Sequence, residues 1–311
     1  MKFALCNEMF ESRPMARVCS VARQLGYHGI EIAPFTLSRS AEDITARQRK
    51  EVRRIIEDHG LETVGLHWLF AGPTGLHITT TDNQIWGRTR DYLSCLLDLC
   101  NGLGGKVLVL GSPKQRSIVE GQTAKGAWQR AVDLLSSVLD KAGSLGLTIC
   151  LEPLSPVETN FINTVAEGMK MVRQINHPSL KIHLDVKAMC SEPAPVPAGG
   201  ILKRSLGMAV RRGAMPKGSA FEPATHVAGI IRSVRAEDIG HFHVNDPNLY
   251  GPGMGDVDYG PIAEAIKDVG YDKWLSVEVF KYDPDPETIA RKSIEYLRKF
   301  WPPFATKTPR H

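Results

Sequence analysis

The chain has 311 residues, 42% of them hydrophobic, which is enough for one large core, and no linker, low-complexity tract or short repeat indicates a second domain. Its formal net charge is only +4, with basic and acidic residues interspersed, so nucleic-acid binding receives little support. No run approaches the 18 apolar residues of a membrane span, and MKFALCNEMFESRP lacks the apolar stretch of a secretion signal. We therefore expect a cytoplasmic protein with a single domain, residues 1–311.

Short apolar runs rich in β-branched residues alternate with longer segments of helical periodicity. This alternation is typical of repeated β-α units around a parallel sheet. Eight runs are strand candidates, and in chain order they are KFALC from Lys2, HGIEIA from His28, ETVGLHW from Glu62, KVLVLG from Lys106, TICLEP from Thr148, KIHLDV from Lys181, GHFHVN from Gly240 and WLSVEVF from Trp274.

Amphipathic segments lie between these runs, and those at 41–60, 84–104 and 126–146 each end in glycine, where a helix can stop before the next strand. Eight strands, each followed by a helix, close into a (β/α)8 TIM barrel. An open, doubly wound sheet is the alternative. Its first strand would be followed by a glycine-rich phosphate turn, and CNEMFESRP contains none, so the barrel is the better prediction.

One connection is longer than the rest. The unit from Lys181 to Gly240 spans about 59 residues, whereas the longest of the others spans about 44. We expect an insertion at about 191–225, with five basic residues and no acidic residue between Gly199 and Ala220. This segment can be a lid over the site or a solvated surface loop, and the sequence does not decide between the two.

Four ionisable residues occur late in consecutive strand candidates, where barrels of this kind build their active sites. Burying a lone carboxylate is costly, and three carboxylates with one imidazole suit a hard or borderline divalent cation. The predicted metal ligands are Glu152, Asp185, His243 and Glu278. The alternative for each residue is an ordinary structural role, in which the glutamates pair with a base such as Lys187 and His243 is a core histidine.

The two glutamates among these ligands suggest proton transfer. With a substrate held between them, one can remove a proton from a carbon beside a carbonyl while the other returns a proton to the neighbouring oxygen or to the opposite face. Glu152 and Glu278 are therefore the predicted catalytic pair of an isomerase or epimerase. No GxSxG, HExxH or P-loop motif competes with this interpretation.

Several longer motifs surround these residues, namely GLHW, LEPLSPVETNFIN, HLDVKAM, HFHVNDPN followed by GPGMGDVDYGPI, and GYDKWLSVEVF. With them the sequence resembles the xylose-isomerase-like sugar phosphate isomerase/epimerase superfamily, and within it the D-tagatose 3-epimerase and hydroxypyruvate isomerase branch, over nearly its whole length. This resemblance implies the same four metal ligands and the same two glutamates as proton-transfer residues.

Two departures concern the substrate. The family's epimerases usually carry a histidine three residues after the ligand aspartate and an arginine after the histidine strand, but this chain has Ala188 and Leu249 or Tyr250 there. Lys187 can take over a substrate-binding role or be a solvated cation. The remaining candidate substrate-binding residues, which can equally be ordinary polar residues at loop mouths, are His67, Glu158, Asn7 and Glu31.

The expected cofactor is one divalent metal ion, Mn²⁺ first and then Mg²⁺ or Co²⁺, and the expected partner is a small sugar, with homo-oligomerisation left open. A trinuclear zinc site, as in the superfamily's endonucleases, is disfavoured because the fourth strand ends in Gly111 and Ser112. A metal-dependent lyase, such as a keto-sugar dehydratase or C-glycoside-cleaving enzyme, and a non-catalytic sugar- or partner-binding barrel are the alternative functions. The six cysteines form no CxxC pair and are expected to be mostly buried thiols.

Overall fold

The protein is a closed eight-stranded barrel surrounded by helices, as seen in a computed structural model that describes residues 1–11, 13–193 and 222–302. All neighbouring strands are parallel, and β1 pairs with β8 to close the ring. The strands are β1 (Lys2–Cys6), β2 (Gly29–Ile32), β3 (Glu62–Leu66), β4 (Val107–Leu110), β5 (Thr148–Leu151), β6 (Leu180–Asp185), β7 (Ile239–Val244) and β8 (Trp274–Val277). The predicted barrel and all eight predicted strands are thereby confirmed.

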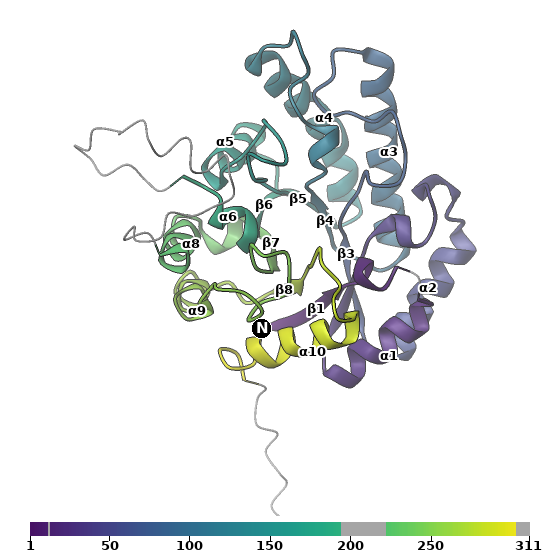
Figure 1. Ribbon diagram of the computed structural model, residues 1–311. Helices are drawn as coiled ribbons and strands as arrows, with labels where there is room; N and C mark the ends of the chain where they lie inside the picture. Colours follow the sequence, from purple (N-terminus) through teal and green to yellow (C-terminus); the bar gives the residue numbers. More distant parts are fainter. Residues whose placement is uncertain (12, 194–221, 303–311) are drawn as a thin grey trace, which may run out of the picture.

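The helices follow the strands around the ring in sequence order, from purple to yellow in Figure 1. They are α1 (Met15–Leu25), α2 (Ala46–Asp58), α3 (Asn83–Gly102), α4 (Ala124–Ser144), α5 (Val165–Ile175), α6 (Val186–Cys190), α8 (Pro223–Arg232), α9 (Tyr259–Asp268) and α10 (Pro286–Leu297). Short 3-10 helices are η1 (Asn7–Phe10), η2 (Pro34–Thr36), η3 (Ala41–Asp43), η4 (Pro113–Gln115) and η6 (Ala236–Asp238). Most of the predicted insertion lies outside the described residues.

The turns that end α2, α3 and α4 follow the pattern expected from the sequence. Gly60, Gly104 and Gly146 all have positive φ, which glycine adopts without the steric cost that a side chain incurs. The helix predicted at 41–60 is divided in the structure, because Thr45 caps α2 through a capping box with Gln48. These local signals set where each helix ends and the next strand begins.

The strands are buried because helices cover the outside of the barrel and side chains fill its interior. Every residue of β2 and β7 is buried, as expected for strands enclosed on both faces. Five of the six cysteines are buried and all six are free thiols, as predicted. Among the described helices, none has both the length and the apolar character needed to cross a membrane.

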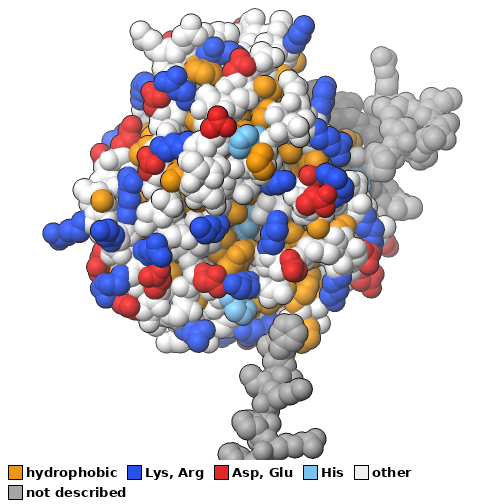
Figure 2. Space-filling view, turned by 180° about the vertical axis from the view of Figure 1, so that it is seen from behind, with side chains coloured by type: hydrophobic (Ala, Val, Ile, Leu, Met, Phe, Trp, Pro, Cys, Tyr) orange, Lys and Arg blue, Asp and Glu red, His pale blue; other side chains and the backbone are white. Residues whose placement is uncertain are grey.

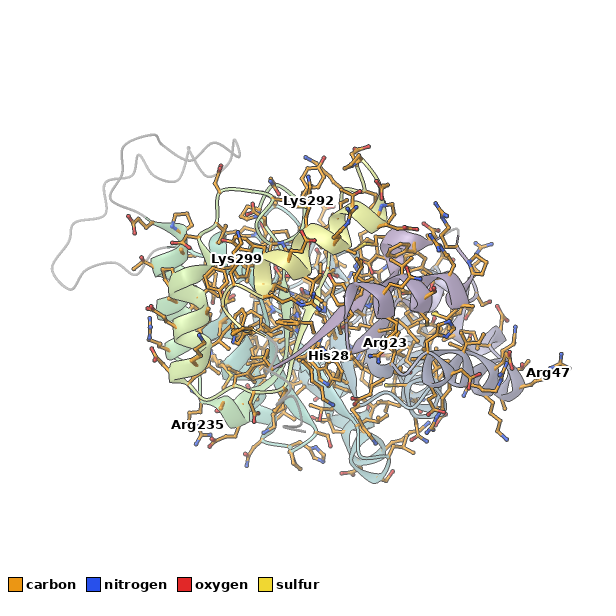
Figure 3. All side chains as sticks on the ribbon, turned by 90° about the horizontal axis from the view of Figure 1, so that it is seen from below. Arg23, His28, Arg47, Arg235, Lys292 and Lys299 are labelled. Carbon is orange, nitrogen blue, oxygen red and sulfur yellow. The ribbon has the colours of Figure 1, made fainter. Side chains whose placement is uncertain are left out.

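The outer surface carries charges of both signs. On the face drawn in Figure 2, Lys and Arg side chains are interspersed with Asp and Glu. The labelled basic residues in Figure 3 belong to different parts of the shell, including Arg23 on α1, Arg47 on α2 and Lys292 on α10. This arrangement matches the mixed charge pattern of the sequence.

Candidate metal centre and active site

The ends of four neighbouring strands bring the four predicted metal ligands into the barrel. Glu152 directly follows β5, Asp185 is the last residue of β6, His243 lies in β7 and Glu278 directly follows β8. Asp185 is paired in register with His243, so these two side chains start from the same level of the barrel. All four side chains are buried, with at most 8% of any residue exposed.

Three of the four predicted ligands belong to one compact group of donor atoms. One ligand atom each from Glu152, Asp185, His243 and also His183 lie within 4.8 Å of one another. Glu278 is not in that group, but its Oε2 lies 3.2 Å from Nδ1 of His243. The donor set is therefore larger than expected, because His183 joins it.

The chemistry of this donor set fits a divalent cation. Within the described residues, neither ring nitrogen of His183 has a hydrogen-bond partner, although both atoms are buried. A buried polar atom without a partner is costly, and a metal ion would supply one. Carboxylate oxygens with imidazole nitrogens are suitable ligands for a divalent ion of borderline character. A Cβ at Gly111 would overlap the Glu152 carboxylate, so glycine makes room for this side chain.

The carboxylates of the centre repel one another in the absence of a cation. Burial, together with Glu278 and Asp185, raises the pKa of Glu152 well above its ordinary value. Burial also tends to raise the pKa of Glu278, but the neighbouring His243 outweighs it and lowers the pKa to about 2. Burial tends to lower the pKa of His243, but the carboxylates of Glu31 and Glu278 hold it above its ordinary value. A divalent cation would relieve this excess of negative charge.

Three hydrogen bonds orient two of the carboxylates. Oδ1 of Asp185 accepts the backbone N–H of Ala188 at 2.6 Å as the N-cap of α6, and its Oδ2 accepts from Asn245 at 2.5 Å. Oε1 of Glu278 accepts the indole N–H of Trp68 at 2.9 Å. Asp185 and Glu278 are thus held by donors from outside their own strands, which limits their rotation within the site.

Two of the predicted substrate-binding residues form an ion pair beside the centre. Nζ of Lys187 lies 3.0 Å from Oε1 of Glu158 and 4.3 Å from the centre of the Phe280 ring. Burial opposes the charge on Lys187, but Asp185 and Glu158 hold its pKa above the ordinary value. Lys187 therefore pairs with Glu158, and not with Glu152 or Glu278 as the structural alternative supposed.

The other predicted substrate-binding residues have partners inside the protein. Nε2 of His67 lies 2.7 Å from Oε2 of Glu8, and both residues are buried. The amide of Asn7 donates to Thr36 and accepts from the backbone of Ala33, so it joins the ends of β1 and β2. Both amide atoms of Asn7 are engaged in this way, and its predicted substrate contact stays a prediction.

Glu31 contacts two histidines inside the barrel. It is fully buried, and its two oxygens contact Nε2 of His241 at 2.7 Å and Nε2 of His243 at 3.0 Å. Burial opposes ionisation, but these two histidines hold the pKa of Glu31 well below its ordinary value. Both oxygens of Glu31 are engaged by imidazoles, and its predicted substrate contact stays a prediction.

Several site residues were missed by sequence reasoning. His183 and His241 each precede a predicted ligand by two residues, so the period of a strand places them on the same inward face. The sequence segments HLD at 183–185 and HFH at 241–243 already show this two-residue spacing. Nothing in the sequence singled out Arg116, which is 1% exposed and donates to the backbone oxygens of Gly111, Glu152 and Ile162. It supports the loop that begins at Glu152.

Comparison with known proteins agrees with this architecture. A family model described as xylose isomerase-like TIM barrel matches residues 19–300. An L-ribulose 3-epimerase of Mesorhizobium japonicum is 27% identical over 225 residues, which are 72% of this chain and 64% of that protein. A D-psicose 3-epimerase of Ruminiclostridium cellulolyticum is 30% identical over 156 residues, which are 50% of this chain and 42% of that protein.

A solved structure of a D-psicose 3-epimerase in the presence of D-fructose superposes with a TM-score of 0.76 and 18% identity, covering 96% of this chain and 99% of that one. At this identity the superposition shows a shared fold. The sequence alignments span less than two thirds of the two curated relatives, 64% and 42% of their lengths. The resemblance expected from the strand-end motifs is confirmed at the level of the family.

Proposed function

The chain belongs to the xylose isomerase-like TIM-barrel family, and from this premise we propose that it is a divalent-metal-dependent isomerase or epimerase of a small sugar or keto-sugar. The observation that carries the proposal is the buried group of Glu152, His183, Asp185 and His243, next to Glu278, at the C-terminal ends of the strands. Relatives that are ketose 3-epimerases support the same chemistry.

In the proposed reaction, Glu152 and Glu278 are the two proton-transfer groups. A divalent ion at this centre would supply polarisation of the substrate carbonyl, which acidifies the adjacent C–H bond. One glutamate removes that proton, and the other returns a proton to the opposite face or to the neighbouring oxygen. Trp68 and His243 hold Glu278 in place, and the backbone clamp of Arg116 holds the loop of Glu152.

Substrate contacts are proposed for Lys187, Glu158 and His67. Lys187 and Glu158 present a fixed donor and acceptor pair beside the centre, which suits the vicinal hydroxyl groups of a sugar. Trp68 stacks on Phe280 with ring centres 6.1 Å apart, and Phe35 lies 5.7 Å from Trp68. These rings form an apolar border against which the C–H groups of a sugar ring can pack.

The proposed metal content can be measured directly. We expect one divalent ion per chain, with Mn²⁺ preferred over Mg²⁺ or Co²⁺, because carboxylates and imidazoles together favour hard to borderline ions. Elemental analysis of the purified protein should show this stoichiometry, and a divalent ion should raise the melting temperature of the metal-free protein. Three metals per chain, or no stabilisation by any divalent ion, would contradict the proposed centre.

The activity itself is tested with a panel of free ketoses, inososes and 3-keto-glycosides in the presence of Mn²⁺. We expect at least one compound to be converted into a product of unchanged mass, because isomerisation and epimerisation only relocate a proton. A product lighter by one water molecule would instead indicate a dehydratase. Tight binding without turnover across the panel would indicate a binding protein.

A further inference from the structure

A buried carboxylate lies beneath the proposed metal centre and joins two histidines of β7. Glu31 comes from β2, and His241 and His243 come from β7, which is not adjacent to β2 in the barrel. All three residues are 0% exposed. The contacts therefore cross the interior of the barrel, away from the solvent-exposed surface, and their geometry constrains both rings.

The two rings meet the carboxylate through the same type of atom. Oε2 of Glu31 lies 2.7 Å from Nε2 of His241, and Oε1 lies 3.0 Å from Nε2 of His243. Both distances are those of hydrogen bonds, and a carboxylate that accepts two of them requires a hydrogen on each Nε2. In a neutral imidazole with hydrogen on Nε2, the lone pair that can bind a metal is on Nδ1.

Nδ1 of His243 points toward the proposed centre. It lies 3.2 Å from Oε2 of Glu278, another predicted ligand, on the side of the ring away from Glu31. We propose that Glu31 is a positioning residue for the metal centre, whose carboxylate fixes the ring orientation and tautomer of His243 so that Nδ1 faces the cation. This inference rests on the ligand set of the proposed function and adds a residue that does not itself touch metal or substrate.

The wild-type protein supplies the first test. With Zn²⁺, which is diamagnetic, bound to ¹⁵N-labelled protein, the histidine spectrum is expected to show His243 bound through Nδ1 with hydrogen on Nε2. Binding through Nε2 would overturn the inference. If neither Zn²⁺ nor Mn²⁺ binds to the wild-type protein, the proposed metal centre is wrong and this inference falls with it.

The second test is the variant Glu31→Gln, which keeps the size of the side chain. An amide offers one acceptor and one donor group, so it cannot accept from both imidazoles in the observed arrangement. Calorimetric titration of the metal-free variant with Mn²⁺ is expected to give a Kd about 10- to 100-fold higher than that of the wild type, the usual effect of removing such a supporting carboxylate. Circular dichroism of the metal-free variant checks that the barrel is folded.

Ser276→Ala is the matched control. Oγ of Ser276 lies 3.0 Å from Nε2 of His241 in the same buried layer. Ser276 is paired with His243 in the β7–β8 register, but within the described residues its hydroxyl makes no hydrogen bond to Glu31 or His243. Its Mn²⁺ affinity is expected to stay within about twofold of the wild type, since the Glu31 to His243 contact persists. If the control weakens binding as much as Glu31→Gln does, or if Glu31→Gln binds Mn²⁺ like the wild type, Glu31 does not position the centre.

Discussion

Replacing Glu152 or Glu278 by glutamine is expected to lower turnover by about 10²- to 10⁴-fold, the usual contribution of a positioned general acid or base. Glutamine keeps an oxygen that can bind the metal and nearly the same volume, but it cannot accept the substrate proton. Metal affinity should therefore fall less than the rate does. The measurement is steady-state turnover of each variant on the ketose found in the panel, with Mn²⁺ saturating.

Glu57→Gln provides the control for this pair. Glu57 is on α2, where its half-exposed side chain pairs with Arg53, and this substitution should leave the rate unchanged. In deuterated water the wild-type enzyme is expected to place deuterium on the carbon beside the carbonyl. A variant that still exchanges this proton without completing the conversion identifies which glutamate abstracts and which returns it. Near-normal turnover in both glutamine variants would exclude the two-glutamate mechanism.

Removing the divalent ion with EDTA is expected to lower turnover by about 10³-fold or more, because a metal supplies several kcal/mol of stabilisation to the charge that develops on the substrate oxygen. Within the part of the chain that the structure describes, Lys187 and Arg116 are basic side chains near the site, and both are already engaged. Lys187 pairs with Glu158, and Arg116 donates to three backbone oxygens. Neither is placed by these contacts to replace a metal ion.

Adding the metal back to the chelated protein distinguishes a loss of turnover caused by metal removal from one caused by unfolding. Adding Mn²⁺ to the chelated protein should recover turnover, and the circular dichroism spectrum of the chelated protein should match that of the loaded one. Elemental analysis must confirm that the ion was removed. Full turnover in a protein shown to be metal-free would contradict the proposed function. If turnover does not return and the spectrum of the chelated protein has changed, the ion was needed for folding.

The strands, their order and the family were predictable from the sequence because each depends on local pattern. Runs such as TICLEP and KIHLDV are apolar and short, and the glycines that end the helices adopt the left-handed conformation that their position requires. Ligand types at the ends of successive strands also predicted a common site, because the C-terminal ends of parallel strands converge on one face of a barrel. Glu152, Asp185 and His243 do meet there.

Which polar groups face one another across the barrel became clear only from the folded structure. Glu31 is 210 residues from His241 and Trp68 is 210 residues from Glu278, so no local pattern links them. The eight β-α units and the residues at the strand ends follow from the sequence alone, since propensity and periodicity act over a few neighbours. The partners of Glu31, the pairing of Lys187 with Glu158 and the entry of His183 into the donor group depend on barrel closure and register, which bring distant strands to hydrogen-bond distance.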